Sequence, residues 1–465
     1  MSRLVVVSNR VPAPGQPPQG GLAVAVQAAM RGRGGIWMGW SGQSSGEAAP
    51  GPLLLREEGA ITYALTDLSA RDLAEYYQGM ANSVLWPLCH YRLGLTDFSR
   101  RDAAGYLRVN RLFAARLAPL LRPDDLIWIH DYHLFPLAAE LRQRGVGNRI
   151  GFFMHIPWPA PDVYLTLPVA EDLLRALTAC DLLGFQTEGD AENFSLCLRR
   201  AGIARPVPGD DGLHEVGARR FRIGAFPISI DVRGFARIAR QAVGNPAMRR
   251  FHASLQGRAL VVGVDRLDYS KGLPQRLAAY RRFLEENPGW LGRVTYLQVT
   301  PQSRSEVAEY AALQHEVAEL AGSINGRLGR LDWVPVRYVN RSFSQQVLAA
   351  LYGMARLALV TPMRDGMNLV AKEYVAAQDP ADPGVLVLSR FAGAAAELGG
   401  GALLVNPYDE EMVAQAIARA VSMPLEQRLE RHAAMAEALR RNDVFDWAAS
   451  CLARLEQVPQ GAERA

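Results

Sequence analysis

The sequence predicts an α/β protein with two doubly wound parallel sheets, and two observations carry this prediction. Short apolar runs alternate with segments of helical periodicity along the chain. This alternation is typical of parallel sheets whose strands are joined by helical crossovers. The length of 465 residues exceeds what one hydrophobic core ordinarily holds, so two domains are expected.

The expected strands are apolar runs that a turn or a helical pattern follows. In the first half they are Leu4–Val7, Leu126–Ile129, Ile150–Met154 and Leu182–Phe185, and in the second half Leu260–Val264, Val294–Val299, Leu357–Val360 and Val385–Leu388. Segments such as Leu134–Arg144 and Ser305–Ala321 have helical periodicity. Parallel sheets bind ligands beyond the carboxyl ends of their strands, so polar residues there are the candidates for a site.

The domain boundary is predicted near Ile230–Pro246, because Phe226–Asp231 closes the first series of strands and a new strand opens at Ala259. The predicted domains are residues 1–235 and 236–440. Residues 441–465 form a tail whose helical pattern, Trp447–Leu455, could pack back on the first domain.

The composition is that of an ordinary globular protein, with 49% hydrophobic and 21% charged residues. The net charge of +4 suits anionic small molecules, and no block of basic residues indicates a nucleic acid partner. The four cysteines form no C-x-x-C pair, which favours reduced thiols in a cytoplasmic protein. Met1–Ser8 reads as a buried strand rather than a signal peptide, and no apolar run is long enough to span a bilayer.

The most informative segment is Arg364–Glu373. Asp365 and Glu373 lie eight residues apart, and a glycine and Asn368 stand between a predicted strand and a predicted helix. The N-terminus of such a helix suits a diphosphate, and an acid further along it can reach sugar hydroxyls. For either acid alone, an ordinary strand–loop–helix with a charged surface is the favoured interpretation.

Basic residues follow several other predicted strands. Arg266 and Lys271 follow Ala259–Val264, Arg304 follows Val294–Val299, and Arg10 ends the first strand in Ser8-Asn9-Arg10. Arginine can clamp a phosphate with two hydrogen bonds. Together with Arg364–Glu373 these residues predict a site for an activated, phosphate-bearing sugar.

Glycines and aromatic residues supply weaker signals in the first half. The pair Gly20-Gly21 opens a helix and could let the backbone approach a phosphate, although a plain loop explains it equally well. Trp37 and Trp40 are bracketed by glycines and are expected to be exposed, whereas Tyr77 and Trp86 flank an asparagine. Such aromatic faces suit sugar rings, but core packing is the common alternative.

Two histidine segments follow predicted strands. His130-Asp131-Tyr132-His133 resembles a metal site only if a helix begins at once, and no third ligand pattern supports a metal. Asp131 is placed to accept a hydrogen bond from a substrate hydroxyl. His155 ends the next predicted strand, just before prolines that fix the backbone. It is equally well explained as a residue that contacts a ligand and as a structural histidine.

The order of these motifs resembles the trehalose-6-phosphate synthases. The likeness spans Ser2 to about residue 445 and rests on Ser-Asn-Arg, Trp-x-Gly-Trp-Ser-Gly, Trp-Ile-His-Asp-Tyr-His, His-Ile-Pro, Asp-Arg-Leu-Asp-Tyr-Ser-Lys-Gly and Arg-Asp-Gly-Met-Asn-Leu-Val-Ala-Lys-Glu. It implies two Rossmann-like domains facing a central cleft, the GT-B architecture. It also implies transfer of glucose from a nucleotide sugar, with UDP-glucose as the expected donor, to glucose 6-phosphate, giving α,α-trehalose 6-phosphate with retained configuration.

The resemblance implies roles for individual residues. For the acceptor these are Arg10, Trp40, Tyr77, Trp86, Asp131 and Arg304, and for the donor Gly20, Gly21, Arg266, Lys271, Phe343, Asp365, Asn368, Leu369, Val370 and Glu373. The catalytic group is Asp131, His155, Arg266, Lys271 and Asp365. It implies no metal and no cofactor beyond the nucleotide-sugar co-substrate. It allows a homo-oligomer, and a separate phosphatase is expected because no Asp-x-Asp-x-Thr motif occurs.

The sequence departs from the pattern of the family at two places, and two alternative functions remain to be considered. The loop Val11–Gly20 is proline-rich and short for the family, and Trp158 stands near His155 where phenylalanine is expected. The rival functions are coupling of a cyclitol on the same scaffold and non-catalytic sensing of a sugar phosphate. The retained polar residues argue against both.

Overall fold

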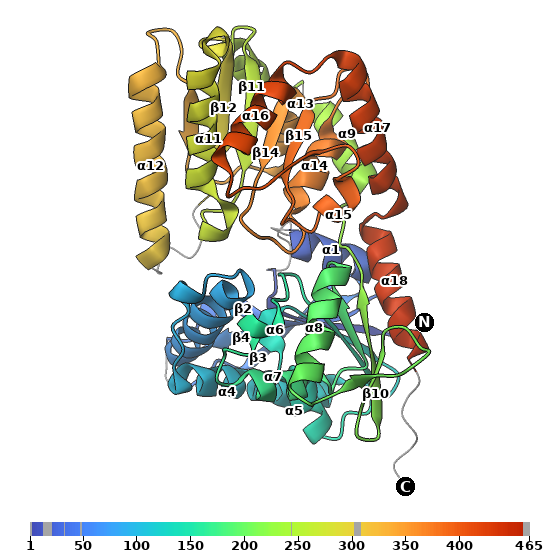
Figure 1. Ribbon diagram of the computed structural model, residues 1–465. Helices are drawn as coiled ribbons and strands as arrows, with labels where there is room; N and C mark the ends of the chain where they lie inside the picture. Colours follow the sequence, from blue (N-terminus) through green and yellow to red (C-terminus); the bar gives the residue numbers. More distant parts are fainter. Residues whose placement is uncertain are drawn as a thin grey trace. The chain divides into compact units, whose positions relative to one another are not determined.

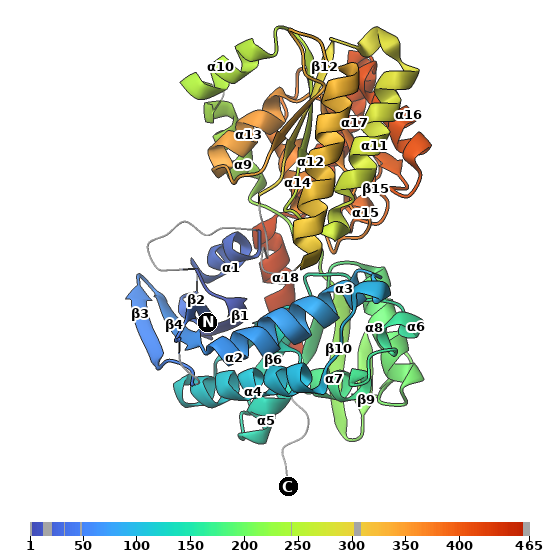
Figure 2. The same cartoon turned by 90° about the vertical axis from the view of Figure 1, so that its left-hand side faces the viewer.

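The chain folds into two compact units. The computed structural model describes residues 2–12, 21–31, 33–46, 49–242, 244–301 and 308–458. The first unit comprises Met1–Ile228 and Val444–Ala465, and the second comprises Ser229–Asp443 (Figures 1 and 2). The predicted α/β class with two Rossmann-like sheets is confirmed. Among the described residues, no helix is long and apolar enough to cross a membrane.

The sheet of the first unit has the order β3-β4-β2-β1-β5-β6-β7-β10-β9-β8. Its strands are β1 (Leu4–Arg10), β2 (Gly35–Ser44), β3 (Leu53–Glu58), β4 (Ile61–Leu68), β5 (Leu126–His130), β6 (Arg149–Phe153), β7 (Leu182–Phe185), β8 (Arg205–Pro206), β9 (Leu213–Val216) and β10 (Arg219–Ala225). The strands from β4 to β10 in this order run parallel, whereas β3, β8 and β9 add antiparallel edges. The sheet is therefore dominated by parallel pairs, in agreement with the predicted fold class, and antiparallel strands extend it at both edges.

The strand order reverses direction between β1 and β5. The chain builds outward from β1 through β2 to β4, and then outward on the other side from β5 through β6 to β7. In open parallel sheets such a switch point leaves room for a ligand beyond the carboxyl ends of the two central strands. Here those ends carry Asn9, Arg10 and Asp131.

Helices surround this sheet and include one unusual segment. They are α1 (Gly21–Arg31), α2 (Ala70–Asp72), α3 (Trp86–Cys89), α4 (Arg100–Leu117), α5 (Leu137–Gln143), α6 (Pro161–Tyr164), α7 (Ala170–Leu177), α8 (Glu188–Arg200) and α18 (Val444–Gln457), together with a π-helix at Leu73–Leu85. Side-chain caps begin several of them, as where Ser99 accepts a bond from the Asp102 amide. The last helix, α18, packs beside α1 and against β6 and β7 (Figures 1 and 2).

The sheet of the second unit is entirely parallel, in the order β13-β12-β11-β14-β15-β16. Its strands are β11 (Ala259–Val264), β12 (Val294–Val299), β13 (Val336–Val339), β14 (Leu357–Val360), β15 (Val385–Ser389) and β16 (Leu403–Val405). Numbered along the chain this is the 3-2-1-4-5-6 order of dinucleotide-binding folds. The switch point lies between β11 and β14.

Both faces of this second sheet are covered by helices. They are α9 (Val232–Ala242), α10 (Pro246–Ser254), α11 (Leu273–Glu286), α12 (Ala308–Leu328), α13 (Gln345–Met354), α14 (Leu369–Ala377), α15 (Ala395–Leu398), α16 (Glu410–Val421) and α17 (Leu425–Arg441). Helices α11, α12 and α16 share one hydrophobic core with the strands, and α9, α13 and α14 pack against one another. The central strands β11, β14 and β15 are almost entirely apolar because both of their faces are buried.

The structure corrects one expectation about exposure. Trp37 and Trp40 lie on β2 and are 1% and 9% exposed, although their flanking glycines favour exposed positions in the sequence. The physical reason is that β2 is an interior strand, paired on one side with β1 and on the other with β4. Such a strand tolerates glycine where a neighbouring backbone approaches closely.

A buried arginine connects the strand ends at the second switch point. Arg276, on α11, donates to Asp265 Oδ2 at 2.5 Å, to Thr361 Oγ1 at 2.9 Å and to the Lys271 carbonyl at 3.1 Å. It also reaches Gln298 Oε1 on β12 at 3.2 Å. Asp265 follows β11 and Thr361 follows β14, so one guanidinium holds both loops in place.

Replacing Arg276 by methionine should therefore destabilise the second unit. The change would leave the Asp265 carboxylate buried without its counter-charge, which costs about 3–5 kcal/mol in comparable buried pairs. We expect the calorimetric transition of this unit to move to a clearly lower temperature.

The matched control is Arg282→Met on the same helix. Arg282 pairs with Glu286 and Glu411 at the surface, where an ion pair contributes about 0–1 kcal/mol. Equal shifts for the two variants would contradict the role assigned to Arg276. The double variant Asp265→Leu with Arg276→Met should recover part of the loss, because no charge is then left buried.

Candidate active site

The polar residues at the first switch point are held by bonds from the sheet and from the π-helix. The Trp37 indole donates to Ser8 Oγ at 2.9 Å, and the Tyr76 hydroxyl donates to Asn9 Oδ1 at 2.8 Å. Arg10, the last residue of β1, is exposed. The backbone at the end of β1 is therefore fixed while the Arg10 guanidinium stays available to a ligand.

Aromatic contacts connect the predicted acceptor residues. The Arg10 guanidinium lies 5.8 Å from the Trp40 ring centre, and the Trp40 ring lies 5.4 Å from that of Tyr77. Tyr77 in turn stacks on His133 at 6.0 Å. Gly42 is required here, because its φ is +88° and a Cβ atom would come within 2.7 Å of Arg10 Nε. The predicted grouping of Arg10, Trp40 and Tyr77 is thus reproduced in space.

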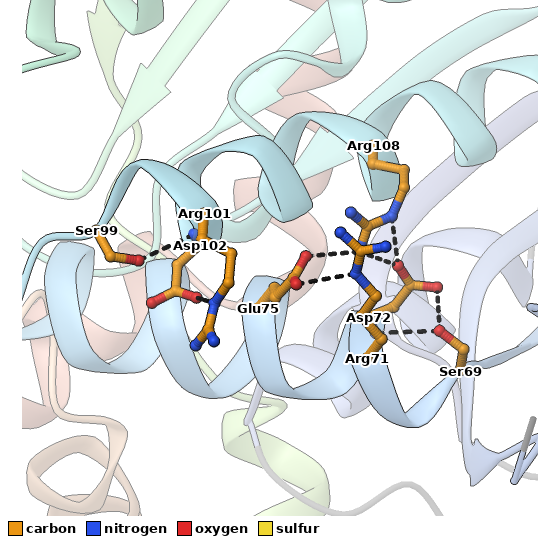
Figure 3. Close-up of polar contacts among 8 residues, drawn as sticks. All are labelled: Ser69, Arg71, Asp72, Glu75, Ser99, Arg101, Asp102 and Arg108. Atoms are coloured by element: carbon orange, nitrogen blue, oxygen red, sulfur yellow. Dashed lines mark hydrogen bonds and ion pairs between the residues drawn. The ribbon is translucent and has the colours of Figure 1, made fainter. Parts of the chain in front are cut away.

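The π-helix that carries Tyr77 is anchored to α4 by charges (Figure 3). Arg108 on α4 donates to Asp72 Oδ1 at 2.8 and 2.6 Å and to Glu75 Oε2 at 3.0 Å. Arg71 also donates to Glu75, with its Nε 2.9 Å from Oε1. Both carboxylates are buried, so these pairs fix the first turn of the π-helix. Wide helical turns of this kind occur frequently at functional sites.

Trp86 is more enclosed than its predicted role would require. It is 4% exposed, and its ring lies 4.2 Å from His90 and 5.7 Å from Tyr132. The Tyr132 hydroxyl donates to Asn82 Oδ1 at 3.0 Å, which ties the π-helix to the loop after β5. The contact between Trp86 and the acceptor stays a prediction, and the burial of Trp86 would restrict such a contact to a small part of the ring.

Asp131 has a strained backbone. Its φ is 77° and its ψ is 166°, a region that glycine ordinarily occupies and that costs about 1–3 kcal/mol for other residues. The strain is held by two bonds, because its amide donates to the Phe153 carbonyl at 2.8 Å and its Oδ1 accepts from the His155 amide at 3.2 Å. This conformation turns the carboxylate toward the end of β6, where His155 lies.

His155 and His130 form a hydrogen-bonded pair. His130 Nδ1 lies 3.0 Å from His155 Nε2. Burial lowers the pKa of His155 to about 3, and burial together with the neighbouring ring lowers the pKa of His130 well below its usual value. Both rings are therefore neutral near pH 7, so His155 acts as a hydrogen-bonding group and not as a cation.

The structure gives no support for a metal at the histidine motif. His130 ends β5, whereas His133 lies in a 3₁₀ turn, so the two do not share one helix face. Among the residues described, no group of three or more histidine, cysteine or acidic side chains could hold a metal ion.

At the second switch point, the predicted donor residues contact one another. Lys271 forms an ion pair with Asp365 Oδ2, and the same oxygen accepts a bond from Asn368 Nδ2 at 3.0 Å. Lys271 is 8% exposed. The loops after β11 and β14 therefore meet through the side chains that the sequence identifies.

Gly272 makes this meeting of loops sterically feasible. Its φ is +64°, and a Cβ atom there would come within 2.9 Å of the Thr361 carbonyl oxygen. The Met363 amide donates to the Ser270 carbonyl at 2.7 Å, so the two loops are also joined through the backbone. The short turn Tyr269–Lys271 is thereby fixed immediately before α11.

Helix α14 begins next to the ion pair. Asn368 caps it with a left-handed backbone, and Leu369 and Val370 occupy the first turn, whose amides lack partners within a helix. Glu373 follows on the second turn. Desolvation raises the pKa of Glu373 to about 7, and the Tyr352 hydroxyl opposes part of that shift. The helix thus presents amide donors and an acid in the predicted order.

The remaining predicted residues that the structure describes lie in loops or at the start of a helix. Arg266 is exposed after β11, and Gly21 is the first residue of α1. Phe343 is half-buried before α13, with the Arg341 guanidinium 4.9 Å from its ring centre. Gly20 and Arg304 lie outside the described residues, as does most of the proline-rich loop.

Trp158, which stands where phenylalanine is expected, belongs to the hydrophobic core. Its side chain is fully buried, its indole donates to Cys197 Sγ at 3.5 Å, and its amide donates to Asp190 Oδ1 at 2.9 Å. The ring packs against Tyr164 and Phe194. The indole therefore fills a hydrophobic space.

Several residues that shape the site escaped the sequence analysis. Arg276 sits inside a helix pattern, Tyr76 reads as one of two equivalent tyrosines, and Tyr352 lies on a distant helix. No local spacing distinguishes them from surface or core residues. For Arg276 the sequence does contain a signal, because an arginine on the apolar face of a helix indicates a buried charge that requires a partner.

Comparisons with known proteins agree with this geometry. The sequence model of Glycosyltransferase family 20 matches residues 7–457. A trehalose-6-phosphate synthase of Sinorhizobium fredii is 59% identical over 451 residues, which cover 96% of this chain and 97% of that protein.

Solved structures show the same likeness. An α,α-trehalose-phosphate synthase (UDP-forming) of Burkholderia xenovorans, in complex with glucose 6-phosphate, is 45% identical with a TM-score of 0.94, covering 98% of this chain and 100% of that one. A protein from E. coli bound with UDP-2-fluoro glucose is 48% identical with a TM-score of 0.93, over the same shares. The resemblance to the trehalose-6-phosphate synthases is confirmed, and the chain belongs to Glycosyltransferase family 20.

Proposed function

We propose that the protein is a retaining glucosyltransferase that transfers glucose from UDP-glucose to glucose 6-phosphate and releases α,α-trehalose 6-phosphate and UDP. The observation that carries the proposal is the joining of Lys271, Asp365 and Asn368 at the start of α14. Relatives that are named for this synthesis, and structures named for glucose 6-phosphate and a UDP-glucose analogue, support it.

On the donor side, charge and hydrogen bonding match a nucleoside diphosphate. Lys271 and the exposed Arg266 would neutralise the diphosphate, and the first-turn amides of Leu369 and Val370 would bind its oxygens. Glu373 would accept hydrogen bonds from the ribose, and the backbone near Phe343 would contact the base. Gly20 and Gly21 would let the backbone approach the donor.

On the acceptor side, Arg10, Tyr77, Trp86 and Arg304 would hold the phosphate of glucose 6-phosphate. Trp40 offers an apolar face for the sugar ring. Asp131 would accept a hydrogen bond from the acceptor hydroxyl, and its strained backbone keeps the carboxylate at the end of β5. His155 and Asp365 would contact the glucose that is transferred.

The chemistry follows from these positions. As the glycosidic bond breaks, negative charge grows on the departing diphosphate, and two cations with a helix N-terminus stabilise it. The acceptor oxygen attacks the glucosyl carbon from the same face, and the leaving phosphate oxygen takes its proton. Configuration is retained because the old and new bonds share that face, and positioning supplies much of the rate.

The cellular setting is proposed on more general grounds. The four cysteines are free and buried, which fits the reducing cytoplasm. A separate phosphatase would remove the phosphate of the product. A homo-oligomer is proposed by analogy only.

The reaction can be tested directly by incubating the protein with glucose 6-phosphate and UDP-, GDP- or ADP-glucose, with and without magnesium. We expect release of UDP and an α,α-linked phosphorylated disaccharide, identified by NMR. Binding without release for any donor would indicate a sensor. Turnover only with a cyclitol phosphate as acceptor would indicate the coupling reaction instead.

Lys271→Ala should lower kcat/KM for UDP-glucose by about 10²-fold or more, because a preorganised charge at the leaving group is lost. Binding of glucose 6-phosphate, measured by calorimetry, should be unchanged. The matched variant is Asp365→Asn, which breaks the ion pair but keeps the cation, so UDP should still bind to it. Equal loss of UDP binding in both variants would show that the pair only maintains the fold.

Glu373 predicts a pH dependence of donor affinity. Below about pH 7 the free protein carries a proton on Glu373, whereas acceptance of two ribose hydrogen bonds requires the carboxylate. Affinity for UDP-glucose, whose diphosphate keeps its charge in this range, should therefore rise roughly tenfold from pH 6 to 8. Glu373→Gln should bind more weakly and show no such rise, and a flat profile for the unaltered protein would refute the assignment.

A further inference from the structure

The histidine pair at the ends of β5 and β6 contains a residue to which the proposed reaction gives no role. His130 is completely buried, and its ring lies 4.5 Å from Trp128 and 6.4 Å from Trp447. Its Nδ1 faces His155 Nε2 at 3.0 Å. Its other nitrogen, Nε2, is buried and has no hydrogen-bond partner among the described residues.

A hydrogen bond between two neutral imidazoles holds one proton, so two arrangements are available. Either His130 Nδ1–H donates to His155, or His155 Nε2–H donates to His130. In the second arrangement the proton of His130 moves to Nε2, where an N–H group would be buried among indole rings without an acceptor. Buried orphan N–H groups are rarer than buried orphan acceptors, so the first arrangement is favoured.

We propose that His130 is a positioning residue that locks His155 in its Nδ1–H tautomer. With Nε2 occupied as an acceptor, His155 keeps its own proton on Nδ1. That nitrogen belongs to a half-buried ring and is the one left to meet a ligand. The end of β6 therefore presents a fixed hydrogen-bond donor, held by the bond from the His155 amide to Asp131.

The consequence for transfer rests on the proposed function. If His155 contacts the transferred glucose, a fixed donor obliges the sugar hydroxyl to accept, and no tautomer change is needed as the reaction proceeds. Without His130, the imidazole can exchange tautomers, and a fraction of the molecules would present a lone pair to that hydroxyl. The loss should then appear in kcat more than in the KM for glucose 6-phosphate.

The variant that removes the bond is His130→Phe, which keeps an aromatic ring in the buried site. His130→Asn restores a donor at the position of Nδ1, since the asparagine amide overlaps that side of the imidazole. The matched control is His214→Phe, which also removes a buried histidine of the first unit. His214 lies on β9, and its Nε2 is 2.7 Å from Ser195 Oγ. Circular dichroism of each variant checks the fold.

The first measurement is the tautomer of His155 in the full-length protein without substrates, from long-range ¹H–¹⁵N NMR correlations assigned with a His155→Gln variant. We expect Nδ1–H in the unaltered protein, in His130→Asn and in His214→Phe, and a shift toward Nε2–H in His130→Phe. An Nε2–H tautomer in the unaltered protein, or no change in His130→Phe, would overturn the proposal.

The second measurement is kinetic. We expect kcat to fall about tenfold in His130→Phe, with a smaller change in the KM for glucose 6-phosphate and recovery in His130→Asn. A tautomer shift without loss of kcat would overturn the link to transfer. Failure of the proposed function itself would appear differently, as no transfer by the unaltered protein although the tautomer remains Nδ1–H.

Discussion

The second unit depends on one buried guanidinium. Arg276 reaches the loops after β11 and β14 and Gln298 near the end of β12 through four hydrogen bonds. Burying an arginine is costly unless its donors and its charge are compensated. Since Asp265, Thr361 and the Lys271 carbonyl can compensate Arg276 only in one arrangement of the two loops, the bond set selects that arrangement. Lys271, Asp365 and the start of α14 inherit their positions from it.

At the switch point of the first unit, side-chain hydrogen bonds fix the strand ends. Neutral donors hold the strand ends: an indole on Ser8, a phenol on Asn9 and an imidazole on His155. Ion pairs lie farther from the strand ends, where Arg108 on α4 binds Asp72 and Glu75 and fixes the π-helix against α4. This division leaves the Arg10 guanidinium exposed beside aromatic faces, an arrangement suited to a sugar that carries a phosphate at one end.

Sequence reasoning identified eight of the parallel strands, among them β1, β5, β11 and β14, because continuous apolar runs are a local signal. It predicted a site beyond them because ligand-binding residues often follow such strands. It failed where structure depends on distant partners. The glycines beside Trp37 and Trp40 suggested exposed positions, because the local sequence does not reveal that β4 pairs with β2 and makes it an interior strand. The antiparallel edges and the π-helix were also missed, since neither has a strong period. Arg276 and His130 became interpretable only once their partners were known.

The ion pair at the second switch point would affect how the donor binds. Lys271 already has a counter-ion in Asp365. Under the proposed assignment, a diphosphate would compete with Asp365 for the same ammonium group, and this competition would lower donor affinity. It would also free the Asp365 carboxylate to accept a hydrogen bond from a sugar hydroxyl once phosphate has taken its place. Part of the binding energy of the donor would then be spent on rearranging this ion pair.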